Sequence, residues 1–164
     1  MGLARRLNIG NNEAVREIID NYKAKFANIT SFLDECVQFA RSHGYVQTML
    51  GRRRPIRDID DRNPQRKALA ERMAINSVVQ GSAADLIKLA MIDLHRRITD
   101  AAPDEPLQGT KMILQIHDEL VFETPYDHAK RARDLIVERM EAAMDLKVPL
   151  KVDAHVSSNW YDGK

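Results

Sequence analysis

This sequence of 164 residues has a single cysteine, few aromatic side chains, no long apolar run and a net charge of only +1. Its single cysteine, Cys36, excludes an internal disulfide framework and a zinc site made of thiolates, and suits a reducing compartment. The longest run without a charged residue, 73–84, is shorter than the roughly 18 residues of a membrane span, so none is expected. Arginines but no apolar stretch follow the first methionine, so we expect no secretory signal.

The remaining composition, 44% hydrophobic and 30% charged, is typical of one globular domain with a real core. The net charge of +1 hides an uneven distribution. Segment 52–72 has eight basic and four acidic residues, whereas segment 104–145 has five basic and ten acidic ones. This pattern would suit a protein that holds a phosphate backbone with one segment and metal ions with the other. On charge counts alone, two solvated faces are the simpler explanation.

Apolar periodicity predicts mainly helices in the first half of the chain. Two amphipathic helices are expected over 13–26 and 32–40, with the second ending at His43 and Gly44. A strand over 45–49 and a partner over 55–59 would follow, joined by a turn at Gly51. Asn63 and Pro64 have the residue types of a helix cap and first turn, so a helix should begin there.

The second half of the pattern adds a small sheet. Gly81 is expected to interrupt the helix before a new one over 83–98, and 101–109 reads as a surface loop. Beyond it we expect a hairpin of 111–116 and 120–123, a helix over 129–143 and a last strand over 148–156. Helices followed by a small antiparallel sheet predict an α+β fold. A first helix so near Met1 also suggests a piece of something larger.

The sharpest chemical feature is the hairpin tip within QIHDELVFE, residues 115–123. Asp118 and Glu119 would be held close together there, despite like-charge repulsion of about 1 kcal/mol or more. Mg²⁺ would offset that repulsion, because it prefers carboxylate oxygens and keeps sites for water and phosphate. For an arbitrary His-Asp-Glu tripeptide, however, an empty polar turn is the commoner explanation.

Two further features could bind nucleic acid. Arg72, Asn76 and Gln80, here called the polar stripe, are four residues apart and so share one helix face. Their donors suit the acceptors of the DNA minor groove, which occur in every base pair. Arg52, Arg53 and Arg54, here called the basic turn, could contact phosphates in a salt-dependent manner. Solvated stripes and basic turns are nevertheless common, and each signal is weak by itself.

Taken together and in order, several segments resemble the C-terminal part of family A DNA polymerases of the bacterial DNA polymerase I type. HDELVFE at 117–123 resembles the family's motif C, and GLARRLNI at 2–9 resembles the stretch after motif B. The likeness extends over essentially the whole chain and includes three further segments: GYVQTMLGRRRPI at 44–56, AERMAINSVVQGSAADLIKLAMI at 70–92 and SSNWYDGK at 157–164.

The resemblance implies roles for the residues just named. Asp118 would be the motif C carboxylate that ligates the catalytic Mg²⁺ ions, Glu119 would support that site, and His117 would lie beside the primer terminus. The polar stripe would contact the duplex through its minor groove. The reaction would join a primer 3′-hydroxyl to the α-phosphate of a deoxynucleoside triphosphate. Primer-template DNA, deoxynucleoside triphosphates and a missing upstream polymerase segment are the implied partners, in the cytoplasm at the nucleoid.

The likeness is incomplete in ways that affect function. The motif A strand, with the family's other metal-binding aspartate, and motif B, which binds the incoming nucleotide, are both absent from this sequence. Residues 1–62 would then be the remainder of the fingers and 63–164 the C-terminal part of the palm. Ser77 to Val79 also stand where relatives often have a proline.

Two other functions fit parts of the pattern. A non-catalytic module could use the basic turn and the polar stripe to bind duplex DNA. A metal phosphohydrolase based on His117 and Asp118 is a weaker alternative, because it needs further ligands on helices. The remaining histidines have no ligand spacing: His43, His95, His128 and His155.

The missing motifs lead to a first prediction. The purified chain with Mg²⁺ and all four nucleotides should give no measurable primer extension, because a two-metal site needs its second carboxylate. Activity should return when the upstream polymerase segment is supplied. Extension by the chain alone would contradict this prediction.

Overall fold

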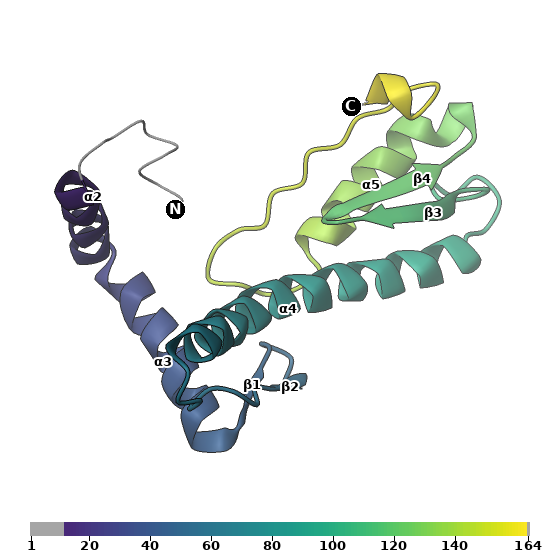
Figure 1. Cartoon of the computed structure of the whole chain (residues 1–164). Helices are drawn as coiled ribbons and strands as arrows, with labels where there is room; N and C mark the ends of the chain where they lie inside the picture. The colour runs from purple at the N-terminus through teal and green to yellow at the C-terminus, as the bar shows by residue number, and fades with distance from the viewer. Residues whose placement is uncertain (1–11, 164) are drawn as a thin grey trace. The chain divides into compact units, whose positions relative to one another are not determined.

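The computed structural model describes residues 12–163, which form two compact units (Figure 1). One unit ends at Val79 and the other begins at Gln80. The predicted α+β class is confirmed, since helices are combined with two small antiparallel sheets. The segment 2–9, which carries part of the family resemblance, lies outside the described residues. The assignment of 1–62 to the fingers and 63–164 to the palm stays a prediction.

The first unit opens with two helices where the periodicity predicts them. They are α2 (Asn12–Lys25) and α3 (Ala27–His43), and α3 begins five residues earlier than its apolar pattern. Gly44 ends α3 in the left-handed conformation, with φ 74°, and its N–H donates to the Ala40 carbonyl at 2.8 Å. Glycine suits this position because it adopts a positive φ without steric cost.

A two-stranded sheet follows, with its second strand earlier than predicted. The strands are β1 (Tyr45–Gln47) and β2 (Arg53–Pro55), paired antiparallel. The expected partner strand 55–59 is therefore wrong, since residues 57–60 form a turn. Ile56 and Ile59 both enter the core, and a spacing of three residues is incompatible with one face of a strand.

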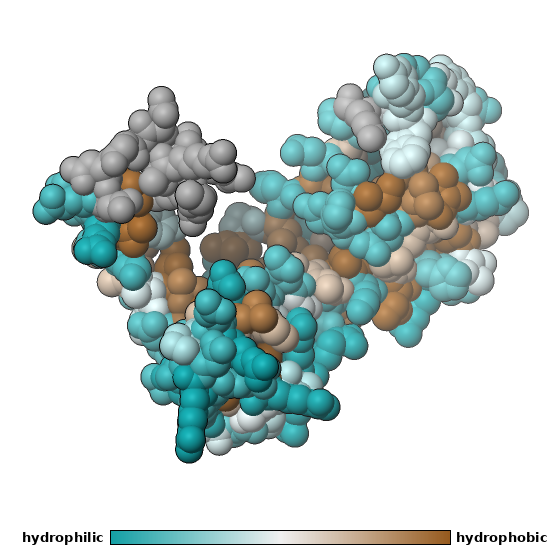
Figure 2. Space-filling view, in the orientation of Figure 1, coloured by the Kyte–Doolittle hydropathy of each residue, from teal (hydrophilic) through white to brown (hydrophobic). Residues whose placement is uncertain are grey.

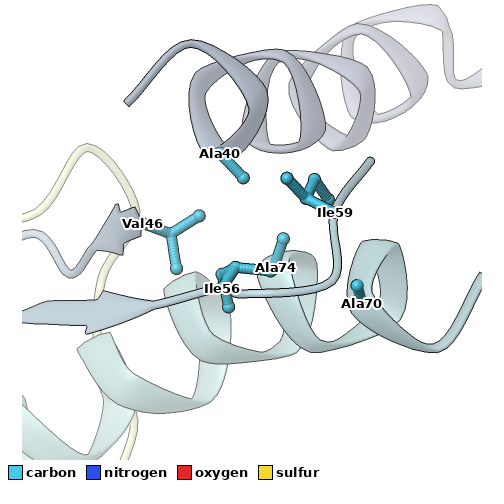
Figure 3. Packing of buried hydrophobic residues seen from close by; sticks show 6 residues of the cluster. All are labelled: Ala40, Val46, Ile56, Ile59, Ala70 and Ala74. Carbon is cyan, nitrogen blue, oxygen red and sulfur yellow. The ribbon is translucent and has the colours of Figure 1, made fainter. Parts of the chain in front are cut away.

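Small side chains on two helices form the core of the first unit (Figure 3). Ala40 lies on α3, and Ala70 and Ala74 lie on α4 (Pro64–Thr99). Val46 of β1 and the two isoleucines that follow β2 pack against these alanines. Because the alanine side chains are small, they leave room for the two larger isoleucines between the helices.

The long helix α4 corrects the expected break at Gly81, because it is continuous from Pro64 to Thr99. The Asn63 side chain caps its start, with Oδ1 accepting from the Gln65 N–H at 2.9 Å and the Arg66 N–H at 3.4 Å. A glycine inside a helix costs about 1 kcal/mol relative to alanine. That cost is smaller than the gain from packing neighbours such as Ala74 and Ala90, which are fully buried.

The second unit packs a hairpin and a helix against the end of α4. The strands β3 (Lys111–Ile116) and β4 (Glu119–Glu123) pair antiparallel, and α5 (Ala129–Glu141) follows. The core contains four fully buried or nearly buried residues: Leu94, Leu107, Ala132 and Ile136. Figure 2 shows hydrophobic surface over the region of the hairpin, where Ile113 and Leu114 are 50% and 43% exposed.

The predicted last strand, 148–156, is wrong. These residues have no regular secondary structure, and the only strand pairing among the described residues of this unit joins β3 to β4. A strand needs a neighbour for its backbone hydrogen bonds, and Pro149 cannot donate one. Among the described residues, no helix combines the length and the apolar character needed to cross a membrane.

Burial and ion pairing shift the pKa of two acidic side chains. The buried Cys36 thiol, on α3, has a raised pKa, chiefly because burial disfavours the thiolate. Asp93 joins α4 to α5: its Oδ2 accepts from Arg139 Nε at 2.8 Å and from Arg97 Nε at 3.1 Å. The hydrogen bond from Arg139 is the main reason why the pKa of Asp93 is lowered.

This lowered pKa gives a second prediction. Asp93→Asn should reduce the free energy of unfolding at pH 7 by up to about 1 kcal/mol, a modest value because the carboxylate is partly exposed. A depressed pKa stabilises the fold above the unfolded-state value near 3.8, and this contribution is lost as the pH falls through the folded-state pKa. Urea unfolding should show a difference at pH 7 that shrinks towards pH 3.

The control is Asp134→Asn, which removes a carboxylate paired only with its neighbour Arg133 and 58% exposed. It should change the stability little at either pH. An equal effect of the two substitutions would contradict the role assigned to Asp93.

Candidate functional site

The acidic tip lies on a tight hairpin, as predicted, but its boundary differs by one residue. Ile116 pairs with Glu119, so only His117 and Asp118 form the turn. The prediction that Glu119 belongs to the tip is corrected, because it is the first residue of β4. A two-residue loop is the commonest way to join antiparallel strands, and it holds the turn residues close to both strand ends.

The backbone of the tip is strained. His117 has φ 55°, in the left-handed region, which costs a non-glycine residue about 1 kcal/mol or more. The Gln115 side chain stabilises the turn, because its Nε2 donates to the His117 carbonyl at 2.5 Å. Strained residues of this kind persist where the surrounding structure fixes them, and they cluster at functional sites.

The chemistry of the tip fits a divalent cation. Asp118 and Glu119 are both exposed, and neither forms an ion pair with a described residue. Carboxylate oxygens are the donors that hard divalent cations prefer. Within the described part of the chain, no three His, Cys, Asp or Glu side chains converge into a metal-binding group. Any ion held by this pair would need its remaining ligands from elsewhere.

The basic turn lies in the first unit, but the prediction that all three arginines belong to a turn is corrected: Arg52 ends the loop between β1 and β2, whereas Arg53 and Arg54 are the first residues of β2. Gly51 has φ 79° and donates its N–H to the Thr48 carbonyl at 2.9 Å, which closes the loop before Arg52. All three arginines are exposed, and Figure 2 shows hydrophilic surface over β1 and β2. Arg53 lies over the ring of Tyr45, with its guanidinium carbon 4.7 Å from the ring centroid. Arg54 Nη1 donates to Ser77 Oγ on α4 at 3.0 Å.

The polar stripe lies on α4, and its three side chains are exposed as the spacing predicts. Arg72 and Asn76 belong to the first unit and Gln80 is the first residue of the second. Glu71 beside Arg72 is neutralised by Arg41 of α3, whose Nη2 lies 2.6 Å from its carboxylate. Both arginines line an open hollow of about 630 Å³ in the first unit. The ion pair with Arg41 therefore compensates the negative charge of Glu71 beside the polar stripe.

The first unit thus contains the basic turn, Arg72 and Asn76, and Arg54 contacts α4 at Ser77. His117, Asp118 and Glu119 belong to the second unit. Sequence reasoning missed Tyr45 and Ser77. Tyr45 faces Pro55 in the register, which makes Arg53 its diagonal neighbour on the same face. The register depends on the position of the loop between β1 and β2, and the sequence pattern places that loop too late in the chain.

Comparison with known proteins identifies the fold and the family. The family model described as DNA polymerase family A matches residues 1–162. The chain belongs to this family. DNA polymerase I of Bacillus caldotenax and that of Geobacillus stearothermophilus are each 47% identical to it over 163 residues. Both alignments cover 99% of this chain.

A solved structure agrees with these sequences. The polymerase domain of Pol1 from M. smegmatis, in complex with DNA primer-template and dNTP, has a TM-score of 0.82 and 39% identity, covering 92% of this chain. The chain spans 18% of the length of the two DNA polymerase I relatives and 25% of the solved chain. The predicted resemblance to family A DNA polymerases is therefore confirmed, for a segment of such a protein.

The strained tip gives a third prediction. His117→Gly should raise the free energy of unfolding by a few tenths to about 1 kcal/mol, because glycine adopts φ 55° without steric cost. Urea denaturation followed by circular dichroism measures the change. Glu119→Gly, in the extended backbone of β4, should instead lower the stability. Equal losses for both variants would show that His117 is not strained.

Proposed function

We propose that this chain provides the motif C carboxylates and part of the duplex-binding surface of a DNA-directed DNA polymerase. Its substrates would be primer-template DNA and deoxynucleoside triphosphates, and its metal would be Mg²⁺. The observation that carries the proposal is the exposed acidic pair, Asp118 in the hairpin turn and Glu119 at the start of β4, in a chain of this family. A cytoplasmic location at the nucleoid follows from the substrate.

The acidic pair would hold the metal end of the site. Asp118 would bind Mg²⁺ directly and Glu119 would support the site from the first position of β4. Bound divalent ions in such a site stabilise the attacking and leaving oxygens of a phosphoryl transfer. His117, in the strained turn, would lie beside the primer terminus. The exposure of both carboxylates and their lack of cationic partners among the described residues support this assignment.

The basic turn and the polar stripe would hold the duplex. The basic turn would contact phosphates, which explains why three exposed arginines follow one another at the end of the loop and the start of β2. Arg72, Asn76 and Gln80 would donate to minor-groove acceptors, which are present in every base pair and allow binding without a sequence preference. The Arg54 contact with Ser77 holds the basic turn against α4, the helix that carries the stripe, which supports this assignment.

The chain would act as part of a longer polymerase. Its relatives are more than five times as long, and motifs A and B are not in this sequence. An upstream segment would supply the second metal-binding carboxylate and the nucleotide-binding helix. Under this proposal, 1–62 belongs to the fingers and 63–164 to the palm.

A second candidate is a duplex-binding module without catalytic activity. It is favoured by one observation: the basic turn, Arg72 and Asn76 belong to one compact unit, which does not include the acidic tip. This module would bind duplex DNA in a salt-dependent manner whatever the state of Asp118.

A chimera distinguishes the two candidates and gives a fourth prediction. The chain would replace the matching segment of Bacillus caldotenax DNA polymerase I, to which it is 47% identical over 163 residues. We expect the chimera to extend primers and Asp118→Asn to slow extension by about 100-fold or more, because metal stabilisation of the transition state is worth several kcal/mol. Asp127→Asn, an exposed acid outside the hairpin, is the matched control.

Each result of this experiment favours one of the two functions. Equal rates for the chimera and its Asp118→Asn variant would refute the metal role. A chimera that binds duplex but does not extend primers, while the parent polymerase is active, would favour the non-catalytic module.

A further inference from the structure

The basic turn holds two of its arginines with uncharged partners. Arg53 lies over the Tyr45 ring at 4.7 Å, and Arg54 donates to the hydroxyl of Ser77 at 3.0 Å. Among the described residues, neither guanidinium has a carboxylate partner. By contrast, Arg41 and Arg139 form ion pairs with Glu71 and Asp93. The positive charges of Arg53 and Arg54 are thus retained while their side chains are held in place.

Tyr45 is itself held by neighbouring rings. The centroid of its ring lies 5.6 Å from that of Phe39 and 5.9 Å from that of His43, and both contacts are edge-on. The rings of Phe39 and His43 stack on each other, with their centroids 4.1 Å apart. Phe39 and His43 lie on the last turns of α3, so the ring under Arg53 rests on a helix. An aromatic face attracts a cation by about 0.5–1 kcal/mol at an exposed site. This attraction orders Arg53 without neutralising it.

Ser77 provides a fixed acceptor for Arg54. Its hydroxyl donates to the Met73 carbonyl one turn earlier in α4, which directs an oxygen lone pair outward. The serine is only 9% exposed, and it lies within a long helix. A guanidinium that donates through Nη1 to this oxygen still has four N–H groups for other acceptors.

We propose that Tyr45 and Ser77 are positioning residues that pre-order Arg53 and Arg54 for contact with DNA phosphates. This inference rests on the proposed duplex-binding function. Each exposed arginine would otherwise lose rotamer freedom when it binds, which costs about 0.5–1.5 kcal/mol per side chain. Partners that order a cation without neutralising it lower this cost and leave the number of phosphate contacts unchanged.

The test distinguishes variants that remove an arginine charge from variants that keep the charge but no longer hold the arginine side chain in place. Binding of the full chain to a random-sequence duplex would be measured by filter retention at several NaCl concentrations. Arg53→Ala and Arg54→Ala should each reduce the slope of log K against log salt by about 0.9, since each removes one phosphate contact. Tyr45→Leu and Ser77→Ala should weaken binding about three- to tenfold at every salt concentration and keep the wild-type slope.

Matched variants control for general effects. Tyr45→Phe keeps the ring and Ser77→Thr keeps the hydroxyl, so both should bind as the wild type does. Tyr126→Leu removes a tyrosine that is 94% exposed, and Ser42→Ala removes a hydroxyl that also donates to the carbonyl four residues earlier. Neither should change binding. Circular dichroism checks folding, and if Tyr45→Leu does not fold, Ser77→Ala decides the test.

Three results would overturn the inference. If Tyr45→Leu and Ser77→Ala bind as tightly as the wild type, the two residues do not position the arginines. If both variants reduce the slope as the arginine variants do, they remove phosphate contacts and do not merely release the arginine side chains. If the wild type itself shows no salt-dependent binding while the chain is folded, the duplex-binding function fails, and the positioning role fails with it.

Discussion

Packing against α4 is the constraint on which both units depend. In the first unit, Ala70 and Ala74 present a smooth surface on which β1, Ile56 and Ile59 pack. In the second, Leu94 is fully buried among residues of α5 and the loop before β3. Apolar contacts therefore fix part of the surface of α4 in each unit, and polar side chains are exposed at positions that these contacts leave free. Arg72, Asn76 and Gln80 are found at those positions.

Much of the fold can be predicted from the sequence, because the burial of apolar side chains leaves a periodic pattern. Apolar side chains that recur every three to four residues locate α2, α3 and α5, and two short apolar runs locate β3 and β4. The errors have physical causes. Gly81 is a weak local signal that the packing of a long helix overrides. The segment 148–156 has the composition of a strand, but a strand also needs a partner, which composition does not reveal.

For the candidate site, too, the sequence predicts the residues but not their partners. His117, Asp118 and the arginines can be named from the sequence because their residue types are informative by themselves. The partners of the arginines cannot, because they follow from the pairing of Tyr45 with Pro55 and from the contact between β2 and α4. The strain at His117 is also invisible in the sequence, since a histidine gives no indication of a positive φ. Residue types thus suggest a chemistry, whereas pairing geometry determines how its side chains are held.

The solitary thiol has a use that the rest of the structure does not suggest. Cys36 is 7% exposed on the inner side of α3, and burial disfavours its reactive thiolate. A maleimide or disulfide reagent can modify it only when that helix separates from its neighbours. Since the sequence has no other cysteine, the labelling rate reports this one opening event, and a fluorophore attached there would monitor the first unit alone.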